Sequence, residues 1–267
     1  MLQLPTNWRA QEICNFSLQN FSLLPESMRP RFILFGDSIT QHSFSPGGWG
    51  AALTDRYARK ADVVLRGYSG YNTRWALFLL SKLFPAGSQD APALVTIFFG
   101  ANDAALPDRS CKRQHVPLPE YKDNLLKIIS TVKSLSKETL IVIITPPPVC
   151  EQTLQEAAWK LFGANPEDAV SRTNEAAGHY AKACAEVAKQ AGVLVVDLWT
   201  CMQEKPGWET RYLSDGLHLT AEGNAVVFEK LLELLNEKGL SFEAMQWDFP
   251  EHGDVNADDP ARTSWGP

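Results

Sequence analysis

The sequence lacks a long apolar run. Nowhere in its 267 residues does an apolar stretch approach the ~18 residues that suggest a membrane-spanning helix. Its first ten residues, MLQLPTNWRA, also lack the basic start and the apolar segment of a secretory signal. These absences predict a protein without a membrane span, and on the same grounds we expect a cytoplasmic location.

Cysteine is sparse and basic residues are not in excess. The five cysteines are scattered and form no C-x-x-C pair, which argues against a disulfide framework and predicts reduced thiols. The net charge of −6 gives no reason to expect binding to nucleic acid or to anionic lipid.

Patterns that bind metals or phosphate groups are missing as well. The five histidines are scattered and show no repeated ligand spacing, so we expect no metal site. The segment GGWG at 47–50 has neither the G-x-G-x-x-G form nor the lysine of a phosphate-binding loop. We therefore expect no cofactor.

What the sequence does contain is enough apolar residues, 45%, for one sizeable core. The length suits a single α/β enzyme domain with added segments. We assign that domain to residues 31–249, preceded by an N-terminal extension at 1–30. Residues 250–267 are rich in Asp, Pro and Gly, which predicts a flexible tail.

Apolar, β-branched runs alternate with segments of helical periodicity. The predicted strands are 31–35, 62–66, 93–99, 139–145 and 192–197, and the predicted helices are 49–60, 73–83, 119–136, 171–190 and 221–238. This alternation predicts an α/β fold of three layers, α/β/α, with a five-stranded parallel sheet in the order 2-1-3-4-5. Ligands of such sheets lie beyond the carboxyl ends of the strands, here after strands one and three.

Two longer loops leave the sheet at that edge, at 104–118 and 146–170. Long loops at an active edge often form pocket walls or lids. A plain surface connection is an equally good interpretation of either loop.

Ser38 stands at the carboxyl end of the first strand, in the sequence Gly36-Asp37-Ser38. That is the expected place for a nucleophile, and a helical turn beginning there would point the Ser38 N–H into the pocket. An N-cap serine in an ordinary β–α turn is the alternative, and for this motif alone it is the better one.

Two further segments offer donors for a developing negative charge. Asn102 follows the third strand, and its side chain could donate to an oxyanion. Gly70 follows the second strand, where the absence of a side chain would let a backbone N–H approach a ligand. Each segment alone is equally consistent with a turn.

Near the C-terminus, Asp215 precedes His218 by three residues. A carboxylate at this spacing can accept the Nδ1 proton of the histidine and leave Nε2 free to act as a base. Thr220 then caps the last helix. A lone D-x-x-H pair is common on surfaces, but together the four segments supply nucleophile, base, orienting acid and oxyanion donors.

These four blocks, in this order, resemble the SGNH (GDSL-type) hydrolase superfamily over about residues 31–238. The segments GDSITQ, GGWG and RGYSGYNTR are similar to the isoamyl acetate-hydrolysing esterase branch, including its plant members. The resemblance implies a flavodoxin-like fold and metal-free hydrolysis of short-chain esters. It assigns a Ser38-His218-Asp215 triad and an oxyanion hole of the Ser38 N–H, the Gly70 N–H and the Asn102 side chain.

Several points stay open at the level of sequence. Trp49 and Tyr71 are candidates for lining the substrate pocket, although core packing explains them equally well. The remaining histidines, of which His42 and His115 lie nearest the motifs, fit surface or packing roles better. The resemblance gives a weak hint of a homodimer. Rival functions are a carbohydrate O-acetyl esterase, thioesterase or lipase on the same scaffold, or a non-catalytic binding protein of this fold.

Overall fold

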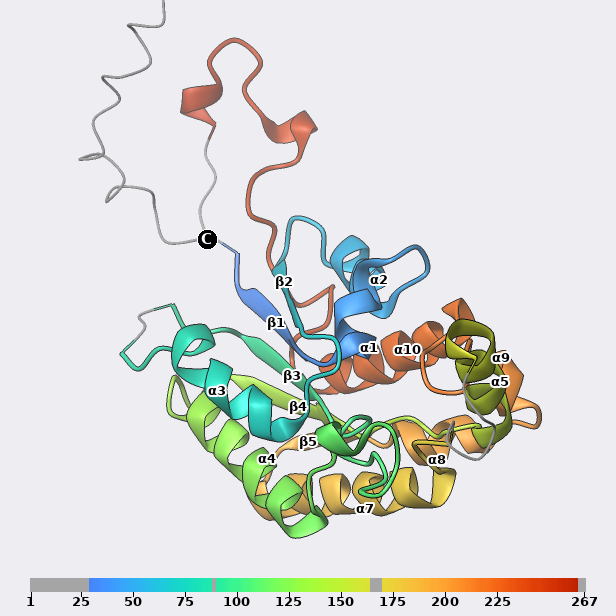
Figure 1. Cartoon of the computed structure of the whole chain (residues 1–267). Coiled ribbons are helices and arrows are strands. Elements are labelled where there is room, and N and C mark those ends of the chain that lie inside the picture. The colour runs from blue at the N-terminus through green and yellow to red at the C-terminus, as the bar shows by residue number, and fades with distance from the viewer. Residues whose placement is uncertain (1–28, 88–89, 164–169, 264–267) are drawn as a thin grey trace, which may run out of the picture.

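A five-stranded parallel sheet forms the centre of the protein, whose computed structural model describes residues 29–87, 90–163 and 170–263 (Figure 1). The strands lie in the order β2-β1-β3-β4-β5, which confirms the predicted order. They are β1 (Arg31–Gly36), β2 (Asp62–Gly67), β3 (Leu94–Phe98), β4 (Leu140–Ile144) and β5 (Leu194–Val196). The register sets Gly36, the last residue of β1, beside Gly67 and Phe98, so three strands end at one edge.

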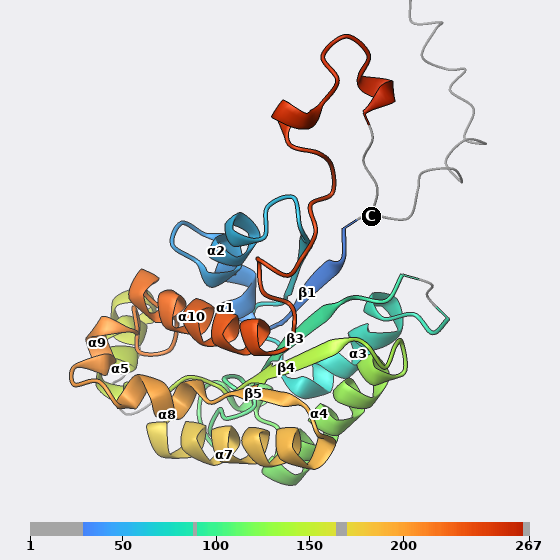
Figure 2. The ribbon, with the colours of Figure 1, turned by 180° about the vertical axis from the view of Figure 1, so that it is seen from behind.

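Helices cover both faces of this sheet. They are α1 (Ser38–Gln41), α2 (Trp49–Arg56), α3 (Thr73–Leu83), α4 (Leu118–Lys133), α5 (Glu151–Phe162), α7 (Asn174–Ala191), α8 (Leu198–Gln203), α9 (Trp208–Arg211) and α10 (Ala221–Glu237). Helices α3, α4 and α7 lie on one face, and α2 and α10 lie on the other (Figures 1 and 2). The predicted three-layer α/β/α fold is therefore confirmed.

Alternation along β1 explains the two layers. Phe32 and Leu34 point into the core under α2 and α10, whereas Ile33 and Phe35 point into the core under α3 and α4. Both sets are almost completely buried, as expected for a parallel strand covered on each side. Burial of these side chains is what holds the carboxyl end of β1 in place.

Two helix boundaries differ from the prediction for a local reason. The helix expected at 171–190 begins only at Asn174, because the Thr173 side chain caps it and accepts from the Ala176 N–H. The helix expected at 49–60 ends at Arg56, and Arg59 then adopts a left-handed conformation with φ 66°. The prediction at 73–83 coincides with α3, and the Thr220 side chain caps α10 as expected.

The expectation of a long connection at 146–170 was wrong in part. Helix α5 occupies the centre of that segment, and residues 164–169 lie outside the described part of the chain. The run of prolines at 146–148 conceals the helix start, because proline cannot continue a helix but often precedes one. The short helices α8 and α9 were also not predicted.

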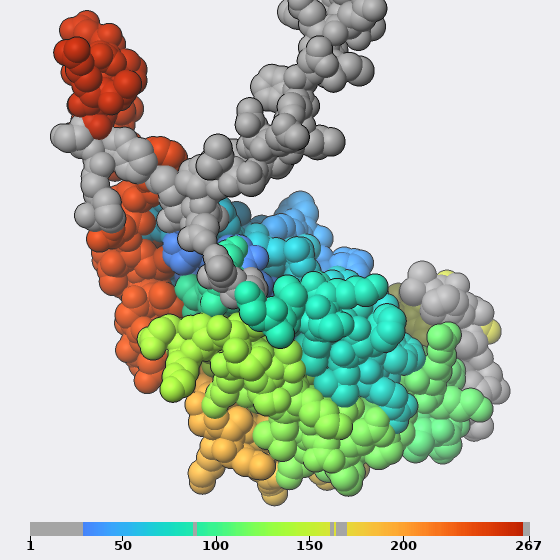
Figure 3. Space-filling model, turned by 90° about the vertical axis from the view of Figure 1, so that its left-hand side faces the viewer, coloured from blue at the N-terminus to red at the C-terminus, as the bar shows by residue number. Residues whose placement is uncertain are grey.

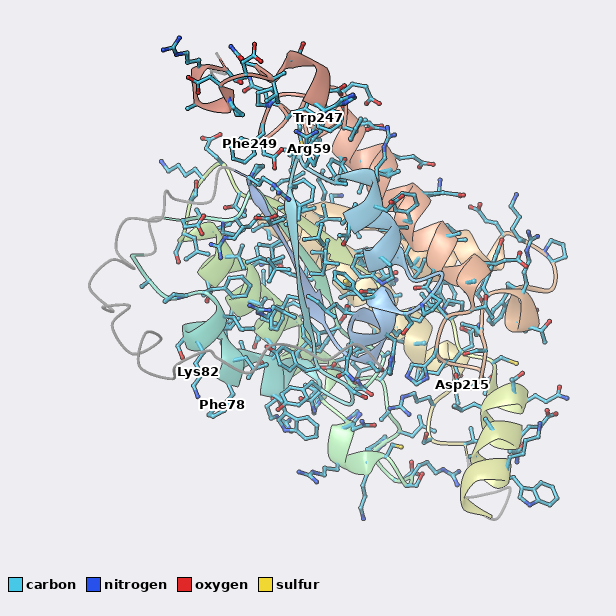
Figure 4. All side chains as sticks on the ribbon, turned by 90° about the horizontal axis from the view of Figure 1, so that it is seen from above. Arg59, Phe78, Lys82, Asp215, Trp247 and Phe249 are labelled. Carbon is cyan, nitrogen blue, oxygen red and sulfur yellow. The ribbon has the colours of Figure 1, made fainter. Side chains whose placement is uncertain are left out.

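The C-terminal part of the domain closes over the amino-terminal end of β2. Asp248 is buried, and its carboxylate pairs with Arg59 at 3.2 Å, while the Arg59 guanidinium stacks on Trp247 (Figure 4). Beyond residue 250, two 3-10 turns, His252–Asp254 and Pro260–Arg262, stand away from the body (Figure 3).

The predicted extension at 1–30 lies outside the described residues except for its last two. No described helix combines the length and apolar character that crossing a membrane requires.

Candidate active site

Ser38 is the first residue of α1, directly after β1. The Asp37 side chain caps this helix by accepting from the Ile39 N–H at 2.9 Å. Gly36 allows the tight entry, because a Cβ there would lie 2.6 Å from the carbonyl oxygen of Phe98. Ser38 thus sits at the start of a helical turn on the carboxyl edge of the sheet, where the motif placed it.

His218 reaches Ser38 from a loop 180 residues away in sequence. Its Nε2 lies 2.9 Å from Ser38 Oγ, and its Nδ1 lies 2.7 Å from Asp215 Oδ2. The other carboxylate oxygen of Asp215 accepts from the N–H groups of Leu217 and His218 at 3.0 and 2.7 Å. The three predicted triad side chains therefore form one continuous line of hydrogen bonds, with Asp215 labelled in Figure 4.

The loop carrying Asp215 and His218 is fixed at both sides. A short antiparallel bridge joins Leu213 to Leu219, and Ser214 N–H donates to the His218 carbonyl at 2.8 Å. The Gly216 carbonyl accepts from the Cys150 N–H at 2.9 Å, which ties the loop to the start of α5. The carboxylate and the imidazole are consequently held by backbone hydrogen bonds rather than by packing alone.

The electrostatics of this pair follow from the hydrogen bonds. The hydrogen bond that His218 Nδ1 donates to Asp215 raises the pKa of His218 above its ordinary value, although burial works in the opposite direction. Burial would raise the pKa of Asp215, but the side-chain and backbone hydrogen bonds from His218 outweigh it and lower that pKa far below its usual range. Asp215 is thus ionised, and a neutral His218 carries its proton on Nδ1.

Asn102 lies in the turn that follows β3, at the carboxyl edge of the sheet. Its Nδ2 donates to the Tyr71 carbonyl at 2.9 Å, and its Oδ1 accepts from Arg172 at 3.0 Å. The neighbouring Asp103 accepts from the Thr73 N–H at 2.9 Å, so the Asn102 turn is locked to the start of α3. Gly70, in the loop after β2, has a φ of 78°, and its carbonyl accepts from Gln114 Nε2 at 3.1 Å.

The two pocket-lining candidates differ in their placement. Trp49 has no exposed surface and packs in the core with α10, which favours the packing interpretation over pocket lining. Tyr71 is half-buried beside Trp75 and lines a hollow of about 290 Å³ with Phe78 and Arg113. Aromatic character alone could not distinguish the two positions.

Three further residues complete the surroundings. His42, for which the sequence favoured a surface or packing role, faces His218 edge-on at 6.1 Å between ring centroids, and both line a pocket of about 270 Å³. Arg172 and Gln114, which the sequence did not single out, contact the predicted oxyanion donors Asn102 and Gly70. No periodic pattern or motif spacing marks these loop residues, so sequence reasoning had no signal for them.

No group of three or more metal-ligating side chains occurs among residues 29–87, 90–163 and 170–263. The described site contains one carboxylate, one imidazole and one hydroxyl in line, and the predicted oxyanion donor Asn102 follows the neighbouring strand β3. This arrangement can transfer a proton away from a hydroxyl and stabilise a negative charge nearby.

Known proteins resemble this chain over most of its length. The family model described as GDSL-like Lipase/Acylhydrolase matches residues 32–231. A GDSL esterase/lipase of Arabidopsis thaliana is 53% identical over 235 residues, which cover 88% of this chain and 97% of that protein. The isoamyl acetate-hydrolyzing esterase 1 homolog of Homo sapiens is 49% identical over 211 residues, covering 78% of this chain and 82% of the human protein.

Solved structures share the fold at lower identity. A lipase/acylhydrolase from Enterococcus faecalis superposes with a TM-score of 0.59 at 21% identity, covering 81% of this chain and 97% of that one. An acetyl-xylooligosaccharide esterase of Geobacillus gives a TM-score of 0.58 at 20% identity, covering 80% and 95%. At these identities the likeness shows the fold alone. The family match and the closely similar esterases go further: the chain belongs to the GDSL-like lipase/acylhydrolase family and is a carboxylic ester hydrolase.

Proposed function

We propose that this protein hydrolyses short-chain, acetyl-type carboxylic esters through an acyl-enzyme on Ser38. The observation that supports this most strongly is the line of two hydrogen bonds, 2.9 Å from Ser38 Oγ to His218 Nε2 and 2.7 Å from His218 Nδ1 to Asp215 Oδ2. A hydroxyl in such a line is activated by the neighbouring base.

In the proposed first half-reaction, Ser38 Oγ attacks the ester carbonyl carbon while His218 Nε2 takes the hydroxyl proton. The negative charge on the carbonyl oxygen is held by the Ser38 N–H, the Gly70 N–H and Asn102 Nδ2. The tetrahedral intermediate then expels the alkoxide, which receives its proton from His218. Asp215 stabilises the imidazolium that exists between the two proton transfers.

In the second half-reaction water attacks the acyl-enzyme carbonyl and gives its proton to His218. Collapse of the second tetrahedral intermediate releases the carboxylic acid and returns the proton to Ser38 Oγ. The enzyme thereby regains its starting state, and no external oxidant, metal or cofactor enters the balance.

The size of the pocket on the His218 side supports a small leaving alcohol. It holds about 270 Å³, near the lower limit for small-molecule sites, and Ile39, Pro46 and Leu219 give it an apolar part. Because His218 protonates the leaving group, the alcohol has to lie on this side. The name of the human relative, an isoamyl acetate-hydrolyzing esterase 1 homolog, points to the same class of ester.

Active-site labelling tests the acyl-enzyme directly. A p-nitrophenyl alkylphosphonate should release one equivalent of p-nitrophenol and leave one adduct on the Ser38 peptide, detected by mass spectrometry. Ser38→Ala should not be labelled, whereas Ser130→Ala, which alters an exposed hydroxyl on α4, should be labelled like wild type. An adduct on another residue, or none on folded wild type, would contradict the assignment and favour a binding protein of the same fold.

A further inference from the structure

A buried guanidinium lies directly behind the proposed oxyanion donors. Arg172 is only 6% exposed and stands just before α7. Its Nε donates to the Ala101 carbonyl at 2.7 Å, and its Nη2 donates to Asn102 Oδ1 at 3.0 Å and to Gln114 Oε1 at 2.6 Å. Nothing in the reaction described above uses this side chain.

The acceptors around this cation are the oxygens of Ala101, Asn102, Gln114 and Ser171 and the thiol of Cys111, and none of them is a carboxylate. Among the ion pairs formed by described residues, none includes Arg172. Burying a guanidinium without a carboxylate partner costs free energy, which a purely structural cross-link between loops would not require. We therefore look for a role of the buried Arg172 charge in the active site.

One reason is the orientation of the Asn102 amide. A guanidinium has only donors, so it can bind only the oxygen end of that amide. Nδ2 is thereby forced to the opposite side, where one hydrogen is donated to the Tyr71 carbonyl at 2.9 Å and the second remains for a ligand. A hydrogen bond from a charged donor also polarises the amide and strengthens its N–H groups as donors.

The same cation reaches the Gly70 donor through one side chain. Arg172 holds Gln114 Oε1, and Gln114 Nε2 donates to the Gly70 carbonyl at 3.1 Å. The main chain of Gln114 is anchored in turn, because its carbonyl accepts from Asn72 Nδ2 at 2.8 Å. Gly70, which has no side chain to restrain it, is thus held through its carbonyl.

We infer that Arg172 is a positioning residue for the oxyanion hole, acting on Asn102 directly and on Gly70 through Gln114. This inference rests on the proposed function of the same site. It predicts that loss of Arg172 weakens stabilisation of the transition state more than binding of the substrate. Displacement of a donor by about 1 Å can cost about 10²-fold in rate, so Arg172→Met should lower kcat by about that factor with little change in KM.

A double-mutant cycle separates positioning from general damage. If Arg172 acts through Asn102, Arg172→Met should cost much less in kcat when Asn102 is already alanine. Rates are expressed per active site titrated with the phosphonate, so a smaller folded fraction does not count as lost catalysis. Gln114→Met, at a half-buried residue, is the second variant: it keeps the Arg172 guanidinium and its bond to Asn102, removes the link to Gly70, and should lower kcat by less than Arg172→Met. Arg56→Met, on the exposed surface of α2, is the matched control.

The Asn102 side-chain amide gives a readout that does not depend on any ester. Its two proton resonances, identified by their loss in Asn102→Ala, should be well separated and slow to exchange in wild type, and should converge or exchange faster in Arg172→Met. Unchanged amide resonances, or kcat losses that multiply across the cycle, would overturn the inference. If wild type hydrolyses no ester, the proposed function fails, and the amide resonances still decide whether Arg172 orients Asn102.

Discussion

Asp215 Oδ2 lies 2.7 Å from His218 Nδ1, across a loop in which the two residues are three positions apart. The second oxygen of the same carboxylate accepts from the His218 N–H at 2.7 Å, so the carboxylate holds both the ring and the backbone of this histidine. The ring can then present Nε2 to Ser38 in only one tautomer. The short loop before α10 is thus a complete acid–base unit.

This unit predicts how the rate depends on pH. Because the hydrogen bond from His218 Nδ1 to Asp215 raises the pKa of His218 above 6.5, the imidazole gains its proton at a higher pH than a free histidine does. Protonated His218 cannot accept the Ser38 proton, so kcat/KM should fall as the pH drops below that raised pKa. A profile from pH 5 to 9 measures it, and a flat rate from pH 5 to 8 would contradict the role of His218.

Asp215→Asn should change both the rate and the profile. Loss of the carboxylate removes the charge that stabilises the imidazolium, so the acid limb should move to lower pH and kcat should fall by up to about 10⁴-fold. Asp55→Asn, at an exposed carboxylate of α2, should leave both unchanged. An Asp215→Asn enzyme with the wild-type acid limb would show that Asp215 does not set the pKa of His218.

The sequence predicted the sheet well because each strand is a short apolar run between clear turn signals. The order of strands followed from the alternation of strand and helix, and α3 and the cap at Thr220 followed from local pattern. Helix α5 escaped notice because it lies in a segment opened by three prolines. The start of α7 was predicted three residues too early, although a local signal marks it, the capping side chain of Thr173.

For the site, the order of the motifs predicted which side chains contact one another, but it did not predict the residues that surround them. Ser38, Asp215 and His218 come together as the motifs predicted. For Trp49 the sequence left pocket lining and core packing equally open, because its neighbours in sequence do not reveal that it is buried in the core with α10. Arg172 and Gln114 could not be found, because what distinguishes them is burial and contact across long sequence separations.

Asn102→Ala tests the proposed oxyanion hole. Removing one donor from such a hole typically lowers kcat by about 10²–10³-fold, and we predict that loss here, with KM little changed. Steady-state kinetics on a p-nitrophenyl ester measure it. Asn236→Ala, at an exposed position of α10, is the control. Wild-type kcat in the Asn102→Ala enzyme would exclude this side chain as a donor.

Gly70→Ala can be compared with a glycine of the same conformation far from the site. Gly70 and Gly239 both have φ 78°, so alanine at either should cost about 1–2 kcal/mol of unfolding free energy. A Cβ at Gly70 would lie 3.3 Å from Gln114 Nε2, whereas one at Gly239 meets nothing within 4 Å. We predict similar losses of stability in urea, with a loss of kcat in Gly70→Ala only. Equal kcat values would argue against Gly70 as a donor.

Asp37 predicts a dependence of stability on pH. This carboxyl is fully buried, and its Oδ2 has no hydrogen-bond partner among the described residues. Burial raises its pKa from 3.8 to about 7. Between those two values the folded chain keeps a proton that the unfolded chain releases, so the unfolding free energy should decrease as the pH rises, by up to about 1.4 kcal/mol per pH unit.

Asp37→Asn retains the oxygen that accepts from Ile39 and removes the titration. Urea unfolding at pH 5 and pH 8 should show that the unfolding free energy of the variant, relative to that of wild type, is higher at pH 8 than at pH 5. Asp123→Asn, at an exposed carboxylate of α4, should follow wild type at both. Parallel behaviour of Asp37→Asn and wild type would show that Asp37 is ionised in the folded protein.

The most direct test of the account is hydrolysis of p-nitrophenyl acetate, butyrate and octanoate by wild type and by Ser38→Ala. We predict that acetate is cleaved fastest, that the rate falls with chain length, and that Ser38→Ala loses nearly all turnover while remaining folded. Preference for octanoate would replace the short-chain proposal with a lipase. Turnover that survives in Ser38→Ala would contradict the central claim that Ser38 is the nucleophile.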